Sequence, residues 1–485
     1  MFYNFFSNTS LANVKYLFAC WLSIVSVGGA LSLSVAVKAY DTLPTLAFSD
    51  AKGFGKYSQG GINGKLYIVN SLADDLVNPA IGTLRYAIKQ KHPRTVVFSV
   101  SGVIKLAGPL KISGDYLTIA GQSSPGGITL AGAPITVSGA KHIVIRYLRF
   151  RLGTFGYADD ALSVRNSEYV IIDHCSLSWS VDETGSFYNN RNFTLQNSII
   201  ANSLNDSIHP KGKHGYGGIW GGANASFIHN IVANHASRTP RINGYRLKPH
   251  YPQADEFVEI IDNIFFNWGH NNVYGSENGR FNLMNNFYKP GLVSKITQIA
   301  DIWYSPLIQN NQAYIADNFY ENNANLSKEN WRGVNYRKQE KAKRTPSKKT
   351  SPWLSATILT PFDTNKHIYL PILPAKEIFN MAIENNEIGA SKNAHGHFVD
   401  SVDRIIYLQL QGKSKSKALI NHENEDMTSW LSYEEQFTKF PVLVDENHDG
   451  VDDQWAKQWF LKHKESSLTN TDNNLLNDYL DSLTE

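Results

Sequence analysis

Cysteine is almost absent from this sequence. Its 485 residues contain only two, Cys20 inside an apolar N-terminal segment and Cys175. If that segment is removed, a single cysteine remains and no intrachain disulfide can form, so the fold depends on its core. We expect Cys175 to pack as a small buried residue rather than to act as a nucleophile.

A large net charge is also missing. The 46 basic and 43 acidic residues leave +3 at neutral pH, which excludes the strongly basic surface typical of a nucleic-acid-binding protein. Apolar residues make up 42% and charged residues 18%, so neither a disordered nor a collagen-like chain fits. The length suits one large domain with appendages, or two or three ordinary domains.

One segment, residues 16–37, is long and apolar. It follows Lys15 and precedes a small-residue site at 36–39, a pattern typical of a secretory signal peptide covering residues 1–39. Its length also fits a retained membrane anchor. In either case the sequence predicts an exported protein, extracellular or periplasmic, with no membrane contact unless the segment is retained.

Signals for two-residue hairpins are scarce, which argues against an antiparallel sandwich. Instead, short strand patterns recur between turns, among them VIIDHC, FTLQNS, SFIHNI, EIIDNI, NLMNNF and YIADNF. Such repeats must stack to bury their apolar faces, and a recurring Asn can form an amide ladder between coils. The sequence therefore predicts an all-β fold, a right-handed parallel β-helix. The aligned polar position falls at His174, Asn197, Asn230, Asn263, Asn286 and Asn318.

Segments outside the repeat are expected to close its ends. Residues 84–92 have a helical pattern that could cap the stack at the N-terminal end. The repeat decays near residue 325, so we expect the β-helix at 40–325 and a loop-and-helix extension packing on it at 326–440. A basic run at 337–349 is either a solvated loop or a contact for a polyanion. Since both ends are capped, we expect a monomer.

The stretch 157–183 holds two pairs of acidic residues, separated by a short apolar strand. Carboxylates are costly to crowd unless a cation or a proton relieves their repulsion. Oxygen ligands of this kind suit Ca²⁺ or Mg²⁺. The alternative is two solvated turns at the ends of strands. The metal-ligand candidates are Asp160, Asp182 and Glu183, with Asp159 beside them.

Basic residues gather in the two coils that follow. Guanidinium groups bind carboxylates bidentately, so arginines beside a carboxylate-bound cation suit a carboxylate-bearing substrate. Stacking would bring Asp160, Glu183 and Arg238 into one groove, although structural pairing of arginines and acids between coils is the alternative. The basic candidates are Lys211, Lys213, His214, Arg238, Arg241 and Arg246.

A second acidic loop lies in the C-terminal segment 441–485. Its sequence, DENHDGVDDQW, matches an EF-hand-like calcium loop at Asp445, Asn447, Asp449 and Asp453. Ala456 stands where the bidentate acid of such a loop is expected. The segment is therefore either a small structural Ca²⁺ loop or an acidic turn.

Together, the motifs DDALSV, VIIDHCSLSWSVDE, GYGGIWGG and SRTPRING closely resemble bacterial pectate lyases of polysaccharide lyase family 1. The resemblance covers roughly residues 48–320. The C-terminal DxNxDGxxDxW loop resembles the thrombospondin type 3-like tail of many bacterial members.

The resemblance implies a secreted enzyme that cleaves an acidic polysaccharide, polygalacturonate, by Ca²⁺-assisted β-elimination to unsaturated oligogalacturonides. Ca²⁺ between protein acids and the uronate carboxylate would stabilise an enolate-like transition state. Arg238 stands at the family's catalytic base, and Arg241 would hold the substrate carboxylate. Lys213 or His214 lies near the family's substrate-binding lysine. The chain departs from the pattern at Phe187, where an acidic ligand is often found.

Two other functions remain open at this point. The first is a lyase for another uronan, such as alginate or a marine sulfated polymer. The second is a carbohydrate-binding β-helix without activity, for which binding would survive the loss of Arg238. A hydrolase fits less well, because it needs two carboxylates flanking the scissile bond and leaves the arginine-rich coil without a role.

Overall fold

The computed structural model describes residues 45–484, apart from 248, 305–310, 339–342, 364–365, 416–417 and 463–470. The expected signal or anchor segment, 1–39, lies outside these residues. The described residues belong to one compact unit that begins at Pro44. Among the helices of this part of the chain, none has the length and apolar character needed to cross a membrane.

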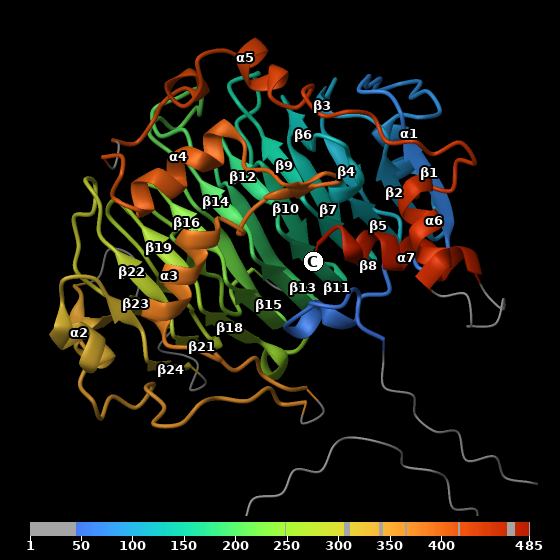
Figure 1. Cartoon of the computed structure of the whole chain (residues 1–485). Coiled ribbons are helices and arrows are strands. Elements are labelled where there is room, and N and C mark those ends of the chain that lie inside the picture. Colours follow the sequence, from blue (N-terminus) through green and yellow to red (C-terminus); the bar gives the residue numbers. More distant parts are fainter. Residues whose placement is uncertain are drawn as a thin grey trace, which may run out of the picture. The chain divides into compact units, whose positions relative to one another are not determined.

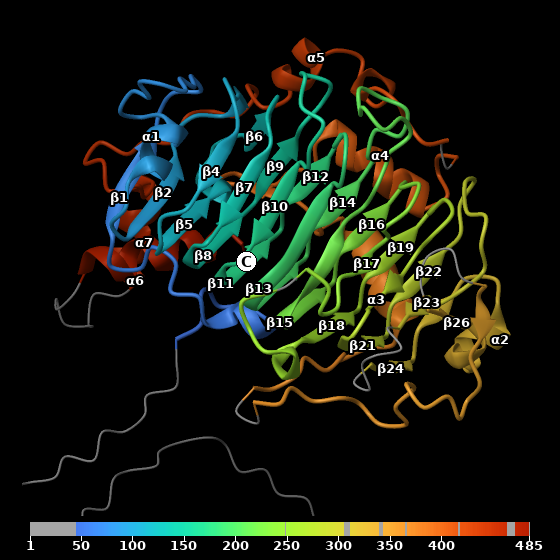
Figure 2. The ribbon, with the colours of Figure 1, turned by 180° about the vertical axis from the view of Figure 1, so that it is seen from behind.

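Parallel β-strands stacked coil upon coil form most of this unit (Figures 1 and 2). They make a right-handed parallel β-helix, which confirms the predicted fold class. One face is a nine-stranded sheet. Its strands are β3 (Gly102–Lys105), β6 (Ile128–Ala131), β9 (Leu148–Arg151), β12 (Ser176–Ser178), β14 (Ile199–Ala201), β16 (Ile231–Ala233), β19 (Ile264–Phe266), β22 (Phe287–Lys289) and β25 (Phe319–Tyr320).

Eighteen of the other strands form a second sheet that folds around two faces of the coil. The two faces join at β13 (Gly185–Gln196) and β15 (Ile219–Ile228), because these long strands pair with shorter strands of both faces. One face contains β4 (Leu110–Ile112), β7 (Ile135–Ser138), β10 (Leu162–Arg165), β17 (Arg241–Ile242), β20 (Tyr274–Gly275), β23 (Ala300–Trp303) and β26 (Val334–Arg337). The other contains β1 (Lys65–Val69), β2 (Arg94–Phe98), β5 (Leu117–Ala120), β8 (Lys141–Arg146), β11 (Glu168–Asp173), β18 (Phe257–Ile261), β21 (Arg280–Met284) and β24 (Gln312–Ala316).

The register of the strands explains why the repeat is apolar. Ile145 of β8 pairs with Ile172 of β11, which pairs with Leu195 of β13, and the column continues through Phe227 and Ile260. All five side chains are buried in the main core. Side chains alternate between the two faces of a strand, so a column of this kind buries every second residue of each repeat. Cys175 is likewise buried and free, as predicted.

The predicted amide ladder is present in the later coils. Asn230 Nδ2 donates to Asn263 Oδ1 at 2.9 Å, and the pattern continues through Asn286 and Asn318 to Asn330. Within this ladder each amide group satisfies the next one in the interior.

His174 and Asn197, however, do not occupy the ladder position. The strand pairing places Cys175 and Ser198 in line with Asn230, since the Ser198 amide donates to Asn230 Oδ1 and the Cys175 amide donates to Ser198 Oγ. His174 and Asn197 lie one position earlier, at a turn with φ values of 48° and 49°. The predicted alignment was wrong by one residue in these two coils, because both adjacent positions carry polar or small side chains.

The N-terminal end of the stack is closed by α1 (Leu84–Lys89), as predicted. Its Leu84, Ala87 and Ile88 join the main core, and the Thr83 hydroxyl accepts a hydrogen bond from the Tyr86 amide at the helix start. At the other end, α2 (Ala324–Lys328) follows β25. The last parallel strand is β26, which lies beyond the boundary expected at residue 325, and it pairs with the antiparallel β27 (Thr345–Pro346).

The C-terminal extension runs back along the β-helix. Helices α3 (Ala375–Asn385), α4 (Ser401–Leu410) and α5 (Trp430–Glu435) cover the nine-stranded sheet (Figure 1). Phe379 of α3, for example, stacks on Phe287 of β22 at 3.9 Å. A short antiparallel pair, β28 (Lys392–Asn393) and β29 (Gly396–His397), lies between α3 and α4.

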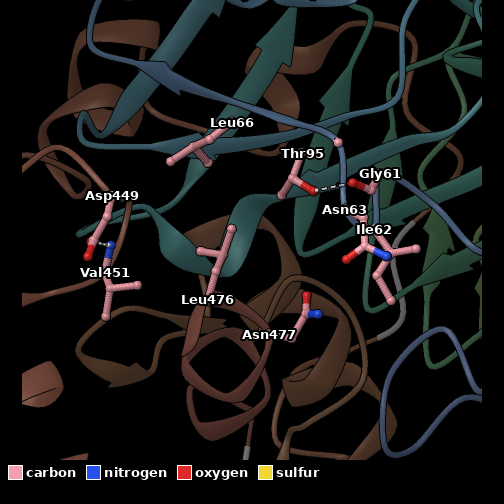
Figure 3. A pocket seen from close by; sticks show the side chains of 10 residues that line it. Gly61, Ile62, Asn63, Leu66, Thr95, Asp449, Val451, Leu476 and Asn477 are labelled. Atoms are coloured by element: carbon pink, nitrogen blue, oxygen red, sulfur yellow. Dashed lines mark hydrogen bonds between the residues drawn. The ribbon is translucent and has the colours of Figure 1, made fainter. Parts of the chain in front are cut away.

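The last helices, α6 (Asp453–Lys462) and α7 (Thr471–Ser482), reach the first coils. Val451 and Tyr479 pack there against Val97 of β2 and Ala120 of β5. A small cavity of about 170 Å³ remains between this tail and the first coil, lined by Leu66, Thr95, Asp449, Val451 and Leu476 among others (Figure 3). Short 3₁₀ helices occur at Phe54–Tyr57, Gly121–Ser123, Gln253–Asp255, Asn330–Gly333 and Glu423–Glu425.

Candidate functional site

The candidate residues are brought together at the ends of strands on one face of the eighteen-stranded sheet. Glu183 forms a parallel bridge to Tyr216, which forms one to Ser237 in the next coil. The Ala161 amide donates to the carbonyl of Glu183 at 3.2 Å. Because the coils stack in register, Asp160, Glu183 and Arg238 lie on successive coils although they are far apart in sequence. This confirms the expectation that stacking gathers them in one place.

Three carboxylates crowd at this place. The carboxylate oxygens of Asp160, Asp182 and Glu183 lie within 4.8 Å of one another. Asp160 and Glu183 are buried, and Asp182 is half-buried. Asp160 Oδ1 accepts a hydrogen bond from the Glu183 amide at 3.1 Å, and Oδ2 lies 3.1 Å from Arg165 Nη2. With Arg238, which contacts Glu183, two arginines face the three acids.

The electrostatics of the cluster reflect this imbalance. Burial raises the pKa of the Asp160 carboxyl to about 7, and the negative charges of Asp182 and Asp159 add to the shift against the attraction of Arg165. A bound divalent cation would offset the repulsion between these acids. All three residues offer carboxylate oxygens, the ligands that Ca²⁺ prefers, so the donor set fits this ion.

Asp159 plays a different part from the other three acids. It is exposed, and its carboxylate Oδ1 accepts a hydrogen bond from the neighbouring Asp160 amide at 2.8 Å. Its backbone carbonyl accepts from the amides of Val181 and Asp182. Asp159 thus holds the backbone of Asp182 in place, and its side chain lies outside the three-carboxylate cluster.

Arg238 lies directly beside the acids. Its guanidinium contacts the carboxylate of Glu183 and lies 4.3 Å from the centre of the Tyr216 ring. Its backbone is left-handed, with φ of 57°, directly before the cis bond between Thr239 and Pro240. The carbonyl of Arg238 packs so closely on Gly217 that a Cβ there would lie 2.3 Å from it, which explains the glycine.

The other arginines differ in their accessibility. Arg241 is buried, with Nη2 2.6 Å from Glu277 Oε1 and its guanidinium 4.6 Å from the Trp303 ring centre. Arg246 is exposed. Partial desolvation lowers the pKa of Arg246, and the positive charge of Arg241 nearby lowers it further. Arg246 is therefore the more accessible of the two to a ligand in the groove.

The loop before β15 brings a mixture of groups to the same place. Lys211 and Lys213 are exposed, and Lys213 Nζ lies 3.8 Å from Asp206. His214 Nε2 lies 3.0 Å from Asp182 Oδ1. Burial lowers the pKa of His214, although Asp182 opposes this. The His214 ring stacks on His209, with centroids 3.8 Å apart.

Several of these neighbours were missed from the sequence. His209 lies in the same HPKGKH segment as His214, and this spacing was the only available signal. Tyr216, Glu277 and Trp303 had none, because their proximity to the arginines depends on the stacking of coils. Phe187, at the position where an acidic ligand was expected, points into the core and stacks on Phe193.

The second acidic loop is tightly wound. Asp445 accepts hydrogen bonds from the amides of Asp449 and Gly450, both at 3.1 Å. Asp453 Oδ2 accepts from the Glu446 amide at 3.0 Å, and Asn447 Nδ2 donates to Asp449 Oδ2. All four predicted ligand residues therefore belong to one compact turn, which leads into α6.

No known protein-family profile matches the chain. Curated relatives are nevertheless found among fungal proteins. The probable pectate lyase C of Aspergillus oryzae is 33% identical over 290 residues, which cover 58% of this chain and 62% of that protein. The protein of the same name from Aspergillus fumigatus is 32% identical over 307 residues, covering 61% and 66%. The chain is similar to pectate lyases.

Each of these alignments spans less than two thirds of the relative's length. Both relatives are fungal. They support the resemblance to pectate lyases but not the expectation that the resemblance is to bacterial members. Among solved structures, the major cedar pollen allergen Jun a 1 matches with a TM-score of 0.50 and 19% identity, covering 70% of this chain and 92% of the allergen. This likeness concerns the fold and agrees with the parallel β-helix.

Proposed function

We propose that the protein is a polysaccharide lyase that cleaves polygalacturonate by Ca²⁺-assisted β-elimination. The observation that carries this proposal is the contact between Arg238 and the three-carboxylate cluster across adjacent coils. Similarity to pectate lyases supports the same reaction. Each of the three acids also has a basic neighbour, so the calcium site is supported by the crowding of the carboxylates within 4.8 Å and by the similarity, not by an unpaired charge.

Asp160, Asp182 and Glu183 would hold the calcium ion. Bound there, Ca²⁺ would withdraw charge from the uronate carboxylate and so stabilise the enolate-like transition state. Arg238 is assigned as the base that takes the proton from the carbon next to that carboxylate. Because an arginine is normally protonated, this assignment rests on the resemblance, with the position of Arg238 beside the acids in support.

The remaining basic residues would bind the polymer. Arg246 is exposed, so we assign it to the substrate carboxylates. Arg241 is largely buried beside Glu277 and Trp303. It would support the site from the interior and offer the substrate the N–H groups that Glu277 does not use. Lys211, Lys213 and His214 lie on the other side of the acids and would bind the next uronate along the chain.

Three properties go with this function. We propose that the protein is exported, on the basis of segment 1–39, and acts as a monomer on an extracellular or periplasmic polysaccharide. It would not bind nucleic acid. The turn that contains Asp445, Asn447, Asp449 and Asp453 would hold a second, structural Ca²⁺, because its oxygen ligands face a common centre in such loops.

A second candidate function is a lyase for another uronan. It is favoured by the basic run at 337–349, whose Arg344 is partly exposed and lies 3.1 Å from Asp301. Substrate profiling separates the two lyases.

The deciding experiment follows ultraviolet absorbance during incubation with polygalacturonate, first with Ca²⁺ and then with a chelator. Unsaturated uronate should accumulate, and the chelator should stop it. Accumulation that ignores the chelator would keep the lyase but remove the acidic cluster as a required calcium site. If polygalacturonate gives no product, alginate and other uronans come next, and binding without turnover would leave a carbohydrate-binding β-helix.

A further inference from the structure

A second group of metal-ligating side chains borders the acidic cluster. One ligand atom each from Asp182, His209 and His214 lies within 4.8 Å of the other two. The two clusters share only Asp182, and they differ in chemistry: the first offers carboxylates alone, the second two imidazoles and one carboxylate. Of this second group, only His209 has no role in the proposed lyase, since Asp182 is also a calcium ligand and His214 is also assigned to the substrate.

The backbone holds the three residues in place. The carbonyl of His209 accepts from the Gly212 amide at 3.0 Å, and the His214 amide donates to the carbonyl of Asn205 at 2.7 Å. The Asp182 amide donates to Asp159, and its carbonyl accepts from the Tyr216 amide. Both ends of the histidine loop and the turn carrying the aspartate are thus fixed, so the three donors are held close together.

The contact between His214 and Asp182 is unusual. Nε2 and Oδ1 are 3.0 Å apart, yet Oδ1 is buried and receives no hydrogen bond from any described residue. Buried carboxylate oxygens normally have a partner. Two ligands bound about 2.0–2.1 Å from a tetrahedral Zn²⁺ are roughly 3.3 Å from each other. The observed separation is about 0.3 Å shorter, so a bound ion would need the two atoms to move apart only slightly.

His209 completes the set. It is buried, and its ring is parallel to that of His214. Its Nδ1 accepts a hydrogen bond from the Lys211 amide at 3.1 Å, which a metal bound at this atom would replace. The rings are now parallel, so binding a common ion requires one imidazole to rotate out of the stack until its nitrogen lone pair points at that ion.

We propose that Asp182, His209 and His214 form a site for a transition-metal ion of the Zn²⁺ class, distinct from the calcium site. Imidazole nitrogen suits Zn²⁺, Co²⁺ or Ni²⁺, whereas Ca²⁺ prefers oxygen. Three protein ligands with one open position is the arrangement of an accessible zinc site. This site does not depend on the proposed lyase activity, since it is defined by its own ligands.

The shared carboxylate couples the two sites. Asp182 cannot give its full charge to two ions, and two dications beside one carboxylate repel each other. Zn²⁺ therefore weakens Ca²⁺ binding, and Ca²⁺ weakens Zn²⁺ binding by the same factor. The occupancy of the calcium site would then depend on the ratio of Zn²⁺ to Ca²⁺.

The test is equilibrium dialysis of the untagged protein against Zn²⁺, with bound metal measured by atomic emission. The wild-type chain should bind one Zn²⁺. The substitutions His209→Gln and His214→Gln should each lower the affinity for this ion at least tenfold. His397→Gln, an exposed histidine on β29, is the matched control and should bind as the wild type does. Thermal unfolding shows whether each variant is folded. If one of the two histidine variants fails to fold, the other is sufficient for the test.

Calcium titration by calorimetry separates this proposal from the lyase. His209→Gln should keep the wild-type affinity for Ca²⁺, whereas Asp182→Asn should weaken both metals. Zn²⁺ binding that is equal in the wild type and both histidine variants, or absent from the wild type, would overturn the zinc site. Neither result bears on whether polygalacturonate is cleaved in a chelator-sensitive manner.

Discussion

Arg149 and Asp400, 251 residues apart in the sequence, form a fully buried ion pair with 2.8 Å between Nε and Oδ2. Arg149 lies on β9 of the nine-stranded sheet, and Asp400 precedes α4. Arg151 joins the pair, 3.0 Å from Asp400 and 2.8 Å from Asp403. The C-terminal extension is therefore attached to the β-helix through charges that water does not reach.

Removing one partner of this buried network should destabilise the protein strongly. In Asp400→Asn, two buried guanidinium groups lose a counter-charge, and we expect the free energy of unfolding to fall by about 3–5 kcal/mol. Urea denaturation measures it. Glu329→Gln, which breaks an exposed pair with Arg332, is the control and should cost no more than about 1 kcal/mol. Equal effects of the two substitutions would contradict the account.

Arg238→Ala should lower turnover of polygalacturonate by about 10²–10⁴-fold, the usual range for a lost acid–base group. The thermal unfolding temperature in Ca²⁺ should change little, since the ion would take over the charge of Glu183. Arg332→Ala, at an exposed position, should leave both quantities unaltered. A large drop in unfolding temperature with modest loss of turnover would instead identify Arg238 as a structural partner of Glu183.

Asp160→Asn and Asp159→Asn should behave differently, although the residues are neighbours. Asp160 belongs to the three-carboxylate cluster, so its loss should raise the Ca²⁺ concentration needed for half-maximal activity at least tenfold. Asp159 acts mainly through its backbone, so its substitution should change that concentration little. Calcium titrations of activity distinguish them, and equal shifts would place the Asp159 carboxylate in the calcium site.

Stability should fall as the pH rises toward 8, because of Glu259. Burial raises the pKa of this carboxyl to about 8, while hydrogen bonds from Ser226 and the Tyr369 amide oppose the shift. The folded state thus binds more protons than the unfolded state between about pH 4.5 and 8, and stability is lost across that window. Glu259→Gln should make the free energy of unfolding less dependent on pH between 5.5 and 7.5.

Urea denaturation at these two pH values is the measurement. Glu435→Gln, on the exposed end of α5, should keep the wild-type slope. A wild-type slope in Glu259→Gln would show that this carboxyl is already ionised at pH 5.5. Some slope should persist in any case, because burial also raises the pKa of Glu256 to about 7.

Calcium should also raise the unfolding temperature through the C-terminal loop. Asp445→Asn should reduce the difference between calcium and chelator in calorimetry, while the calcium dependence of activity stays as in the wild type. Asp160→Asn should show the opposite pattern. If Asp445→Asn leaves the calorimetric difference intact, the loop is an acidic turn without a metal.

The fold was predictable because apolar residues recur at a spacing that only stacking can bury. Which residues share a column was harder to predict. In DHC and QNS, two neighbouring positions could each have joined the amide ladder, and a shift of one residue exchanges the inner and outer faces of a strand. The alignment chose His174 and Asn197, whereas the strand register selects Cys175 and Ser198.

The candidate site was predictable where motifs are contiguous and unpredictable where loops intervene. Asp160, Asp182, Glu183 and Arg238 come together because each lies just before a strand of the stacked coils, with Asp182 and Glu183 adjacent in one coil. His209 was missed because the loop between Asn205 and His214 does not follow the repeat. The Asn205 amide donates a hydrogen bond to the carbonyl of Ile420, which fixes one end of this loop. That contact comes from the C-terminal extension, which the repeat pattern does not describe.

The packing of Val451 and Tyr479 on Val97 and Ala120 has a consequence for biosynthesis. In a solenoid each coil depends mainly on its neighbours, so folding can advance from the first coil while the chain is still emerging. Here residues 451–480 cover an apolar strip on coils made more than 300 residues earlier. That strip stays bare until this segment has been made, and a chain truncated before residue 441 would present it permanently to other chains.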